Sequence, residues 1–115
     1  MTTLYGIKNC DTIRKARKWL EANEIKYHFH DVRNDKLNAA QLKHWIETIG
    51  WETLLNKRGM SWRKLEDKEK MNLDASKALR LMLAQPAMIK RPLLEFNDEL
   101  FCGFSEAHYQ QLFQC

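Results

Sequence analysis

The chain contains little of what marks disulfide-rich or membrane-spanning proteins. Its 115 residues include three cysteines, four glycines and two prolines, and 44% of them are hydrophobic. No stretch approaches the roughly 18 apolar residues of a membrane span, and the N-terminus lacks the basic and then apolar pattern of a signal peptide. The cysteines are odd in number and lack metal-type spacing. We therefore expect a cytoplasmic protein with reduced thiols, no metal site and no membrane partner.

Charge of one sign is not in large excess either. The formal net charge is +4, and basic residues alternate with acidic ones along the predicted helices, which is typical of solvated helix faces. Two tighter basic groups, Asn56–Lys64 and Ile89–Pro92, are candidates for a local anion site. No RNA- or DNA-binding motif accompanies them. We expect a monomer without a nucleic-acid partner.

The first third of the chain is typical of a β-α-β unit. Thr3–Ile7 has the composition of a strand, and Asp11 is placed to cap an amphipathic helix that loosens near Asn23. Lys26–Val32 alternates apolar and polar residues like a second strand. The apolar residues at helical spacing are Ile13, Ala16 and Leu20. This order favours a parallel strand pair joined by a right-handed crossover.

Helices dominate the middle of the chain. One is predicted from Asn38 to Gly50, with a start like a capping box, and another from Asp74 to Gln85. The segment between them breaks at Gly59, so its basic residues are expected on an outward-facing loop. The buried faces are predicted to consist of Leu42, Trp45, Ile46 and Ile49 in the first helix and of Ala75, Leu79, Met82 and Leu83 in the second.

The last third changes to strands. Two short apolar runs flank Asn97-Asp98, a dipeptide suited to a hairpin turn. Ser105 is placed to cap a final helix with Tyr109 on its buried side. The sum is an α/β fold with a four-stranded mixed sheet flanked by helices. We expect one domain, residues 1–115, with a helical insertion at about 38–85, because the chain is too short for two ordinary domains.

Cys10 stands where the first strand gives way to the first helix. Unpaired backbone N–H groups and the helix dipole would stabilise its thiolate, Thr12 could add a hydroxyl donor, and Lys8 and Arg14 place positive charge nearby. A small buried structural cysteine is the alternative. Ile13 occupies the place of the second cysteine of a C-x-x-C motif, so Cys10 would act as a monothiol. Its mixed disulfide would then need glutathione or a resolving cysteine.

The element order, the cysteine at the first strand–helix turn and the segment "IKRP" before the hairpin together resemble the thioredoxin-like fold of the arsenate reductase (ArsC)/Spx family. The resemblance covers nearly the whole chain. The segments "YGIKNCDTIRKARKWLE", "GWETLLNKRGMSWRKL" and "QPAMIKRPLLE" are similar to the short YffB-like branch of that family. Members of this branch have been proposed to be glutathione-dependent thiol reductases.

The resemblance implies that Cys10 is the nucleophile and that Pro92 is a cis-proline beside its thiol. Arg91 matches an arginine that binds the oxyanion or the intermediate in arsenate reductases, a task that suits the guanidinium fork. For a further family arginine, Arg58 is the candidate, with Lys57 left open beside it. The predicted substrate-binding residues are Lys8, Asn9, Thr12, Arg14, Arg58, Arg91 and Pro92.

Two departures from the family pattern bear on arsenate. Gly6 replaces the histidine that lies four residues before the cysteine in glutaredoxin-coupled arsenate reductases, and Gly103 replaces a further arginine. We expect arsenate reduction to be weak, because each lost charged contact costs about 1.5–3 kcal/mol. Gly6→His with Gly103→Arg should raise it, provided that both backbones tolerate a side chain.

The sequence thus predicts a glutathione-dependent thiol-disulfide oxidoreductase that uses Cys10, with no bound cofactor and with glutathione as co-substrate. Its partners would be glutathione or a glutathionylated substrate, and glutaredoxin. Two alternatives remain: a glutaredoxin-coupled arsenate reductase, and a non-enzymatic protein-binding regulator like the Spx members, against which the missing C-x-x-C weighs. Whether Cys102 or Cys115 resolves Cys10 is also left open.

Overall fold

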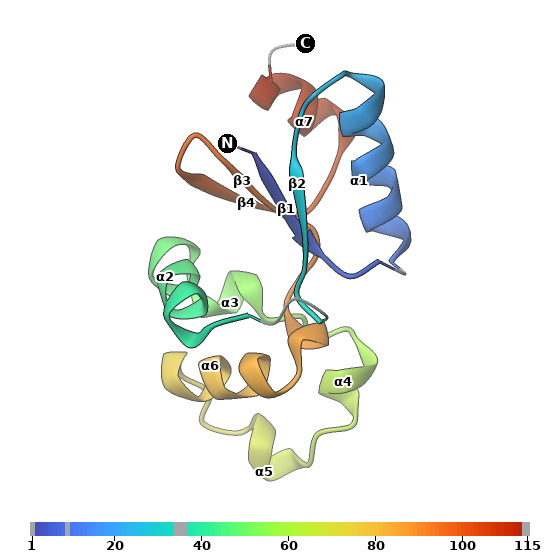
Figure 1. Cartoon of the computed structure of the whole chain (residues 1–115). Coiled ribbons are helices and arrows are strands. Elements are labelled where there is room, and N and C mark those ends of the chain that lie inside the picture. Colours follow the sequence, from blue (N-terminus) through green and yellow to red (C-terminus); the bar gives the residue numbers. More distant parts are fainter. Residues whose placement is uncertain (1, 9, 34–36, 114–115) are drawn as a thin grey trace. The chain divides into compact units, whose positions relative to one another are not determined.

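The computed structural model describes residues 2–8, 10–33 and 37–113. A β-α-β segment is followed by a run of helices and then by a β-β-α segment, as predicted (Figure 1). The elements are β1 (Thr3–Gly6), α1 (Asp11–Ala22), β2 (His28–Asp31), α2 (Ala39–Ile49), α3 (Trp51–Leu54), α4 (Met60–Arg63), α5 (Asp67–Lys70), α6 (Ala75–Ala84), the 3₁₀ turn η1 (Pro86–Met88), β3 (Leu93–Phe96), β4 (Glu99–Cys102) and α7 (Glu106–Phe113).

The four strands form one mixed sheet in the order β2-β1-β3-β4. Strand β1 is parallel to β2 and antiparallel to β3, and β3 forms a hairpin with β4. The register pairs Leu4 with Phe29 on one side and with Leu94 on the other. The predicted four-stranded mixed sheet with flanking helices is therefore confirmed. The first two strands are shorter than predicted by one residue at the end of β1 and by one to two residues at each end of β2.

Helices α1 and α7 cover the same face of the sheet, because both contribute to one core cluster. Leu4 and Leu94 pair across neighbouring strands and pack with Ala16 and Leu20 of α1 and with Tyr109 of α7. All five side chains are fully buried. Burial of a large apolar side chain stabilises the fold by about 1.5–3 kcal/mol, so this cluster holds both helices against the strands.

The start of α1 differs from the prediction. Asp11 is the first helical residue, and the N-cap is Cys10, whose φ of −110° and ψ of 128° are extended. The backbone N–H of Arg14 donates to the Cys10 carbonyl at 3.0 Å, which makes Cys10 the residue at which the helix begins. An aspartate suits either the cap or the first turn, where the helix dipole favours a carboxylate. The shift of one residue places the thiol on the helix terminus itself.

The hairpin and the last helix follow the sequence signals. Asn97 and Asp98 adopt φ values of 52° and 61°, the left-handed pair that a two-residue hairpin turn needs. The Ser105 hydroxyl accepts from the backbone N–H of His108 at 3.1 Å, and the Ser105 carbonyl accepts from Tyr109 N–H at 3.0 Å. Ser105 therefore caps α7 as predicted.

The chain divides into two compact units. The sheet unit comprises 1–32 and 91–115, and the insert unit comprises Arg33–Lys90, which is wider than the predicted insertion of about 38–85. We describe each unit by itself. That the whole chain behaves as one domain remains a prediction.

The two long helices of the insert unit begin at side-chain caps, of which the cap at Asn38 was predicted. The Asn38 side chain accepts from Gln41 N–H, and the Asp74 side chain accepts from Lys77 N–H, both at 2.8 Å. Gly50 ends α2 with a φ of 89°, a conformation that glycine adopts without strain.

The buried faces of these two helices largely agree with the prediction. Leu42, Trp45 and Met82 are fully buried. Ala75 was expected on the buried side but is exposed, because α6 begins at this residue and turns its first position outward. Ala78, four residues before Met82, is buried in its place.

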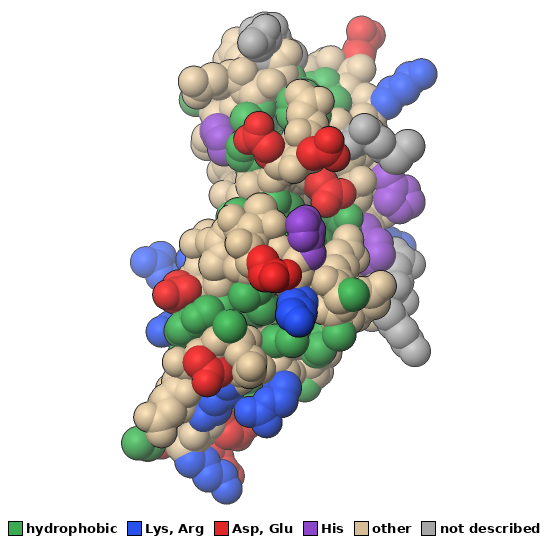
Figure 2. Space-filling view, turned by 90° about the vertical axis from the view of Figure 1, so that its left-hand side faces the viewer, with side chains coloured by type: hydrophobic (Ala, Val, Ile, Leu, Met, Phe, Trp, Pro, Cys, Tyr) green, Lys and Arg blue, Asp and Glu red, His purple; other side chains and the backbone are tan. Residues whose placement is uncertain are grey.

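The helices of the described residues are short, and charged side chains of both signs lie on the visible surface (Figure 2). Among the described residues, no helix is long and apolar enough to cross a membrane. Figure 2 shows acidic and basic side chains scattered over the visible face, without a large area of one sign. This face therefore shows no concentration of the net charge of +4.

Candidate active site

The end of β1 brings the first turn of α1 against the sheet. A Cβ atom built on Gly6 would lie 2.1 Å from Ile13 Cδ1 and 2.7 Å from Ile13 Cγ1, far inside contact distance. Ile13 is fully buried, so it has little room to move. A side chain at position 6 would therefore force Ile13 to shift, and Gly6 permits the close approach of helix to strand without such a shift. This contact lies in the first turn of α1, which begins at Cys10.

The Cys10 thiol has a pKa below its ordinary value. Partial burial alone would raise the pKa, because it disfavours the charged thiolate. The backbone N–H groups of Ile13 and Thr12 and the side chain and charge of Arg91 act in the opposite direction and lower the pKa. The Cys10 side chain forms no regular cap hydrogen bond with α1, so these are close electrostatic contacts with the sulfur. These contacts outweigh the burial. The result is a half-exposed thiol with an enhanced thiolate fraction, which is the form that acts as a nucleophile.

The cation beside the thiol is Arg91, whereas Lys8 and Arg14 were predicted to supply that charge. Lys8 is exposed, and Arg14 forms an ion pair with the exposed Asp11. Neither is among the groups that lower the pKa of Cys10. Thr12 contributes its backbone N–H, and the expected contact from its hydroxyl is not among those that act on the thiol.

Sheet pairing explains why Arg91 reaches Cys10. Strands β1 and β3 are antiparallel, and Tyr5 lies opposite Leu93. The residues that follow Tyr5 therefore run beside the residues that precede Leu93. Arg91 is half-buried at this place, although a lone arginine at a strand start would ordinarily be solvated. The Arg91-Pro92 peptide bond is cis, as the family resemblance implied.

Gly6 and Gly103 both have structural reasons to be glycine, and this corrects one expectation. Gly103 has a φ of +90° and donates its N–H to the Pro92 carbonyl at 2.9 Å. An arginine there would be strained by the backbone although space is available. A histidine at Gly6 would collide with Ile13. Gly6→His with Gly103→Arg was expected to raise arsenate reduction provided that both positions tolerate a side chain. Neither position accepts one without a clash or backbone strain.

The predicted residues of the insert unit lie on an exposed bend. Arg58 and Lys57 are both exposed. The Arg58 backbone N–H donates to the Asn56 side chain at 3.0 Å, and Lys57 Nζ lies 5.6 Å from the centre of the Trp62 ring. Because they belong to the other unit, their role at Cys10 remains a prediction. Asn9 lies outside the described residues.

The second described cysteine has a different environment. Cys102 is half-buried in β4, opposite Leu93, and neither it nor Cys10 forms a disulfide. Burial and the nearby Cys102 thiol raise the pKa of Tyr109 well above its ordinary value, so its phenol stays neutral. Cys115 lies outside the described residues. Among those described, no three side chains of the metal-binding types form a group that could hold an ion.

The fold and this site define a class. A mixed β2-β1-β3-β4 sheet, a cysteine at the first strand–helix junction and a cis-proline before β3 are the features of a thioredoxin-like domain. More narrowly, the sequence model of the ArsC family matches residues 5–112. The chain belongs to the ArsC family.

Individual relatives agree with this assignment. The solved structure of the YFFB (PA3664) protein is 44% identical, with a TM-score of 0.92, over 96% of this chain and 97% of that one. An arsenate reductase (ArsC) related protein from Brucella melitensis is 48% identical, with a TM-score of 0.80, over 99% and 95%. The global transcriptional regulator Spx of Enterococcus faecalis is 31% identical over 92% of this chain and 81% of its own.

Proposed function

We propose that the protein is a glutathione-dependent thiol-disulfide oxidoreductase with Cys10 as its single nucleophile. One observation carries the proposal: Cys10 is the N-cap of α1, and two backbone N–H groups of the first turn and the Arg91 guanidinium lower the pKa of its thiol. These donors would not stabilise the neutral thiol of a structural cysteine, whereas each of them stabilises a thiolate.

The proposed reaction is an exchange of thiols on sulfur. The Cys10 thiolate attacks a glutathionylated substrate, forms a new S–S bond to the glutathione sulfur and releases the substrate as a thiolate. A second glutathione thiolate then attacks the mixed disulfide, forms oxidised glutathione and regenerates Cys10. In the net reaction one free glutathione thiolate is consumed, the substrate thiolate is released and the disulfide passes from the substrate to oxidised glutathione, so no other redox group is needed.

Arg91 has a second role in this proposal. Its planar guanidinium can form two parallel hydrogen bonds to a carboxylate, so it can hold a glutathione carboxylate when the sulfur no longer carries charge. The test is to incubate reduced protein with oxidised glutathione and measure the intact mass.

We expect a gain of one glutathione on Cys10 and none in Cys10→Ser. A Cys102→Ser/Cys115→Ser variant should be modified like the wild type if glutathione itself resolves Cys10. Modification confined to Cys102 or Cys115, with Cys10 unmodified, would rule out the proposed role of Cys10. Loss of turnover in the double variant would instead identify a resolving cysteine within the chain.

Arsenate reduction is a second candidate, favoured by the ArsC family match. We expect it to be weak, because arsenate is a small and strongly hydrated anion that needs several converging charged donors. At the positions of Gly6 and Gly103 no such donor can be placed without strain. With glutathione and glutaredoxin supplied, robust arsenite formation that disappears in Cys10→Ser would favour this candidate.

A binding regulator is the third candidate, favoured by the similarity to proteins named Spx. Ile13 stands where a C-x-x-C switch would carry its second cysteine. A pulldown from lysate distinguishes this candidate. A partner retained at full strength by Cys10→Ser would indicate docking without thiol chemistry, whereas a partner retained only through Cys10 would support the oxidoreductase.

A further inference from the structure

The sheet unit carries a groove that the proposed thiol chemistry does not use. It is lined by Lys15, Lys18, Trp19 and Ala22 of α1 and by Phe104, Ser105 and Glu106 at the start of α7. Its volume is about 650 Å³, which is within the range of pockets that hold peptides or small ligands. We name it the α1–α7 groove.

Two aromatic side chains, Trp19 and Phe104, line the α1–α7 groove and pack against a third ring beneath them. Trp19 and Phe104 both pack edge-on against Tyr109, with ring centres 5.7 and 4.7 Å apart. Tyr109 is fully buried. Because both rings rest on a buried partner, they offer a preformed apolar surface to a ligand.

Positive charge surrounds these two rings on the α1 side. Lys15 and Lys18 line the groove, and Glu106 is the carboxylate on its α7 side. Glu106 belongs to the first turn of α7, where the helix dipole already compensates a negative charge. The two lysines therefore favour an anionic ligand.

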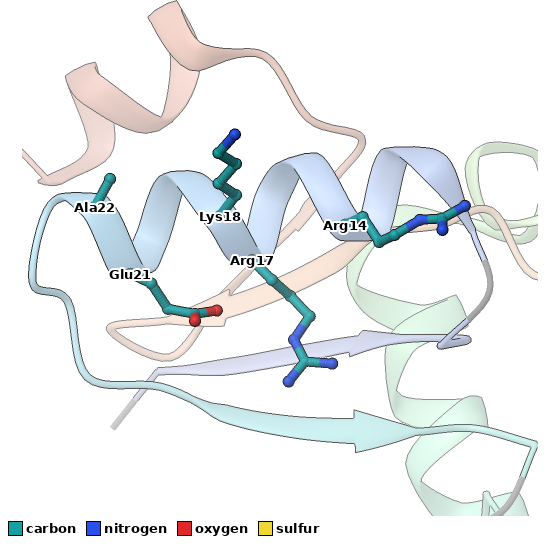
Figure 3. A pocket seen from close by; sticks show the side chains of 5 residues that line it. All are labelled: Arg14, Arg17, Lys18, Glu21 and Ala22. Carbon is teal, nitrogen blue, oxygen red and sulfur yellow. The ribbon is translucent and has the colours of Figure 1, made fainter.

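A second hollow continues the positive surface along α1. It has about 610 Å³ and is lined by Arg14, Arg17, Lys18, Glu21 and Ala22, so it shares Lys18 and Ala22 with the groove. Figure 3 shows these side chains placed along α1, with Arg14 near the start of the helix and Ala22 at its end. The one carboxylate, Glu21, accepts a hydrogen bond from the Tyr27 hydroxyl at 2.9 Å.

Arg17 is fixed in this second hollow. Its Nε donates to the Tyr27 hydroxyl at 3.0 Å, and its guanidinium lies 4.4 Å from the centre of the Phe29 ring. A cation held in this way loses little freedom when an anion binds to it. Both hollows thus combine ordered groups with positive charge on one helix.

That helix begins at Cys10. At a rise of about 1.5 Å per residue, the groove residues Lys15 to Ala22 lie roughly 8–18 Å along α1 from the thiol. An extended peptide advances about 3.3 Å per residue. A substrate chain whose glutathione mixed disulfide lies at Cys10, and which runs along α1 on the side of the groove, would place in it a residue about three to five positions from its own cysteine.

We propose that the α1–α7 groove binds a segment of the protein substrate, with an aromatic or large apolar residue flanked by carboxylates, close to the cysteine whose mixed disulfide Cys10 attacks. The inference rests on the proposed function. It makes the preferred substrate a disulfide-bearing protein and not free oxidised glutathione. The two aromatic side chains contact the apolar residue, and Lys15 and Lys18 face the carboxylates.

The test uses short peptides whose cysteine carries 2-nitro-5-thiobenzoate as a mixed disulfide. In one peptide the cysteine is followed by three small residues and then by Asp-Phe-Glu; matched peptides carry Lys-Phe-Lys or Asp-Gly-Glu instead. Attack by the Cys10 thiolate joins Cys10 to the peptide sulfur and releases the coloured nitrothiobenzoate thiolate. Glutathione that carries the same label measures the reactivity of the Cys10 thiol toward a substrate that is too short to occupy the groove.

We expect the Asp-Phe-Glu peptide to react about tenfold faster than the Lys-Phe-Lys peptide, with the advantage falling as salt rises. Lys15→Ala/Lys18→Ala should remove most of this advantage and leave the rate with labelled glutathione within about twofold. The matched control is Lys26→Ala/Lys43→Ala, which removes two exposed lysines elsewhere and should retain the preference.

The outcomes separate the groove from the chemistry. If Cys10 fails to react even with labelled glutathione, the proposed function is wrong. If labelled glutathione reacts but all three peptides react alike, or both lysine double variants lose the preference equally, the groove inference is overturned. A cysteine-free Asp-Gly-Glu peptide that inhibits as well as a cysteine-free Asp-Phe-Glu peptide would also overturn it, because the surface would then bind anions without regard to the aromatic residue.

Discussion

Cys10 and Arg91 form the functional pair at the scale of residues. Removal of the guanidinium deletes a hydrogen bond and a positive charge from the thiolate, so Arg91→Ala should raise the pKa of Cys10 and Arg91→Lys should raise it less. The measurement is the pH dependence of iodoacetamide alkylation, followed at each cysteine by mass spectrometry. In the wild type the midpoint for Cys10 should lie below the ordinary thiol value of about 8.5. A midpoint at or above that value would make Cys10 a structural cysteine.

The rate of glutathione-linked turnover should also depend on Cys10 and Arg91. Arg91→Ala should weaken glutathione-linked turnover through both the thiolate and the carboxylate contact, each charge-assisted bond being worth about 1.5–3 kcal/mol. Because Arg91 is half-buried, the free energy of unfolding is measured in parallel to exclude a loss of fold. Unchanged kinetics in this variant would remove Arg91 from the site.

A lowered thiol pKa also makes stability depend on pH. The folded state favours the Cys10 thiolate, so its contribution is fully present above the unfolded pKa of about 8.5 and is lost as the pH falls through the folded pKa. The free energy of unfolding of the wild type relative to Cys10→Ser should therefore increase as the pH rises across this interval. Urea titrations at several pH values measure it. A flat difference would contradict the lowered pKa.

We expect any side chain at Gly6 to lower the free energy of unfolding for a steric reason. Gly6→Ala should cost about 1–3 kcal/mol of stability through overpacking against Ile13. In an Ile13→Ala background the added methyl group finds room, and the cost of Gly6→Ala should largely disappear. Gly59→Ala is the control, because its Cβ would meet only the end of the Asn56 side chain, at 3.2 Å. An equal cost in both backgrounds would argue against the contact.

At the scale of elements, short-range signals set most boundaries. Asn38 and Ser105 each cap a helix as predicted, Asp74 caps the helix predicted to start near it, and Asn97-Asp98 forms the turn. These features depend on residues within one turn of each other, so the sequence contains them in full. The cap of α1 was predicted at Asp11 but lies one residue earlier, at Cys10, because Asp is favoured both at the cap and just inside it.

The cap of α7 also supports the proposed groove. Ser105→Ala should destabilise the protein by about 0.5–2 kcal/mol, because the His108 N–H loses its acceptor. Ser76→Ala, an exposed position inside α6, removes the same hydroxyl and should be near neutral. Chemical denaturation of both variants measures the difference. Equal effects would mean that the Ser105 hydroxyl does not cap the helix.

Contacts between distant parts of the sequence were harder to predict. Placement of the thiol at a helix start follows from local pattern, but the identity of its cation does not. Arg14 and Lys8 are close in sequence, whereas Arg91 reaches Cys10 only because β3 pairs antiparallel with β1. The steric role of Gly6 likewise depends on the depth at which Ile13 packs, which no composition or spacing reveals.

At the scale of the whole molecule, the single-domain prediction can be tested by cooperativity. Trp19 belongs to the sheet unit, and Trp45, Trp51 and Trp62 belong to the insert unit. With 5-fluorotryptophan incorporated, each ring gives its own fluorine signal, assigned by single Trp→Phe variants. One domain predicts that all four native signals disappear at the same urea concentration. A separate midpoint for Trp19 would show that the units unfold independently.

The division of the chain places Arg91 at a particular point. Lys90 is the last residue of the insert unit, and its N–H donates to the Leu54 carbonyl at 2.7 Å, while Arg91 is the first residue back in the sheet unit. The residue that stabilises the thiolate is thus joined by one peptide bond to a segment fixed within the insert. During evolution, the insert can change in length and sequence over most of its course, but a shift at its exit would carry the arginine away from the sulfur. We expect the exit of the insert unit, at Ile89 and Lys90, to tolerate insertions and deletions less than any other part of that unit.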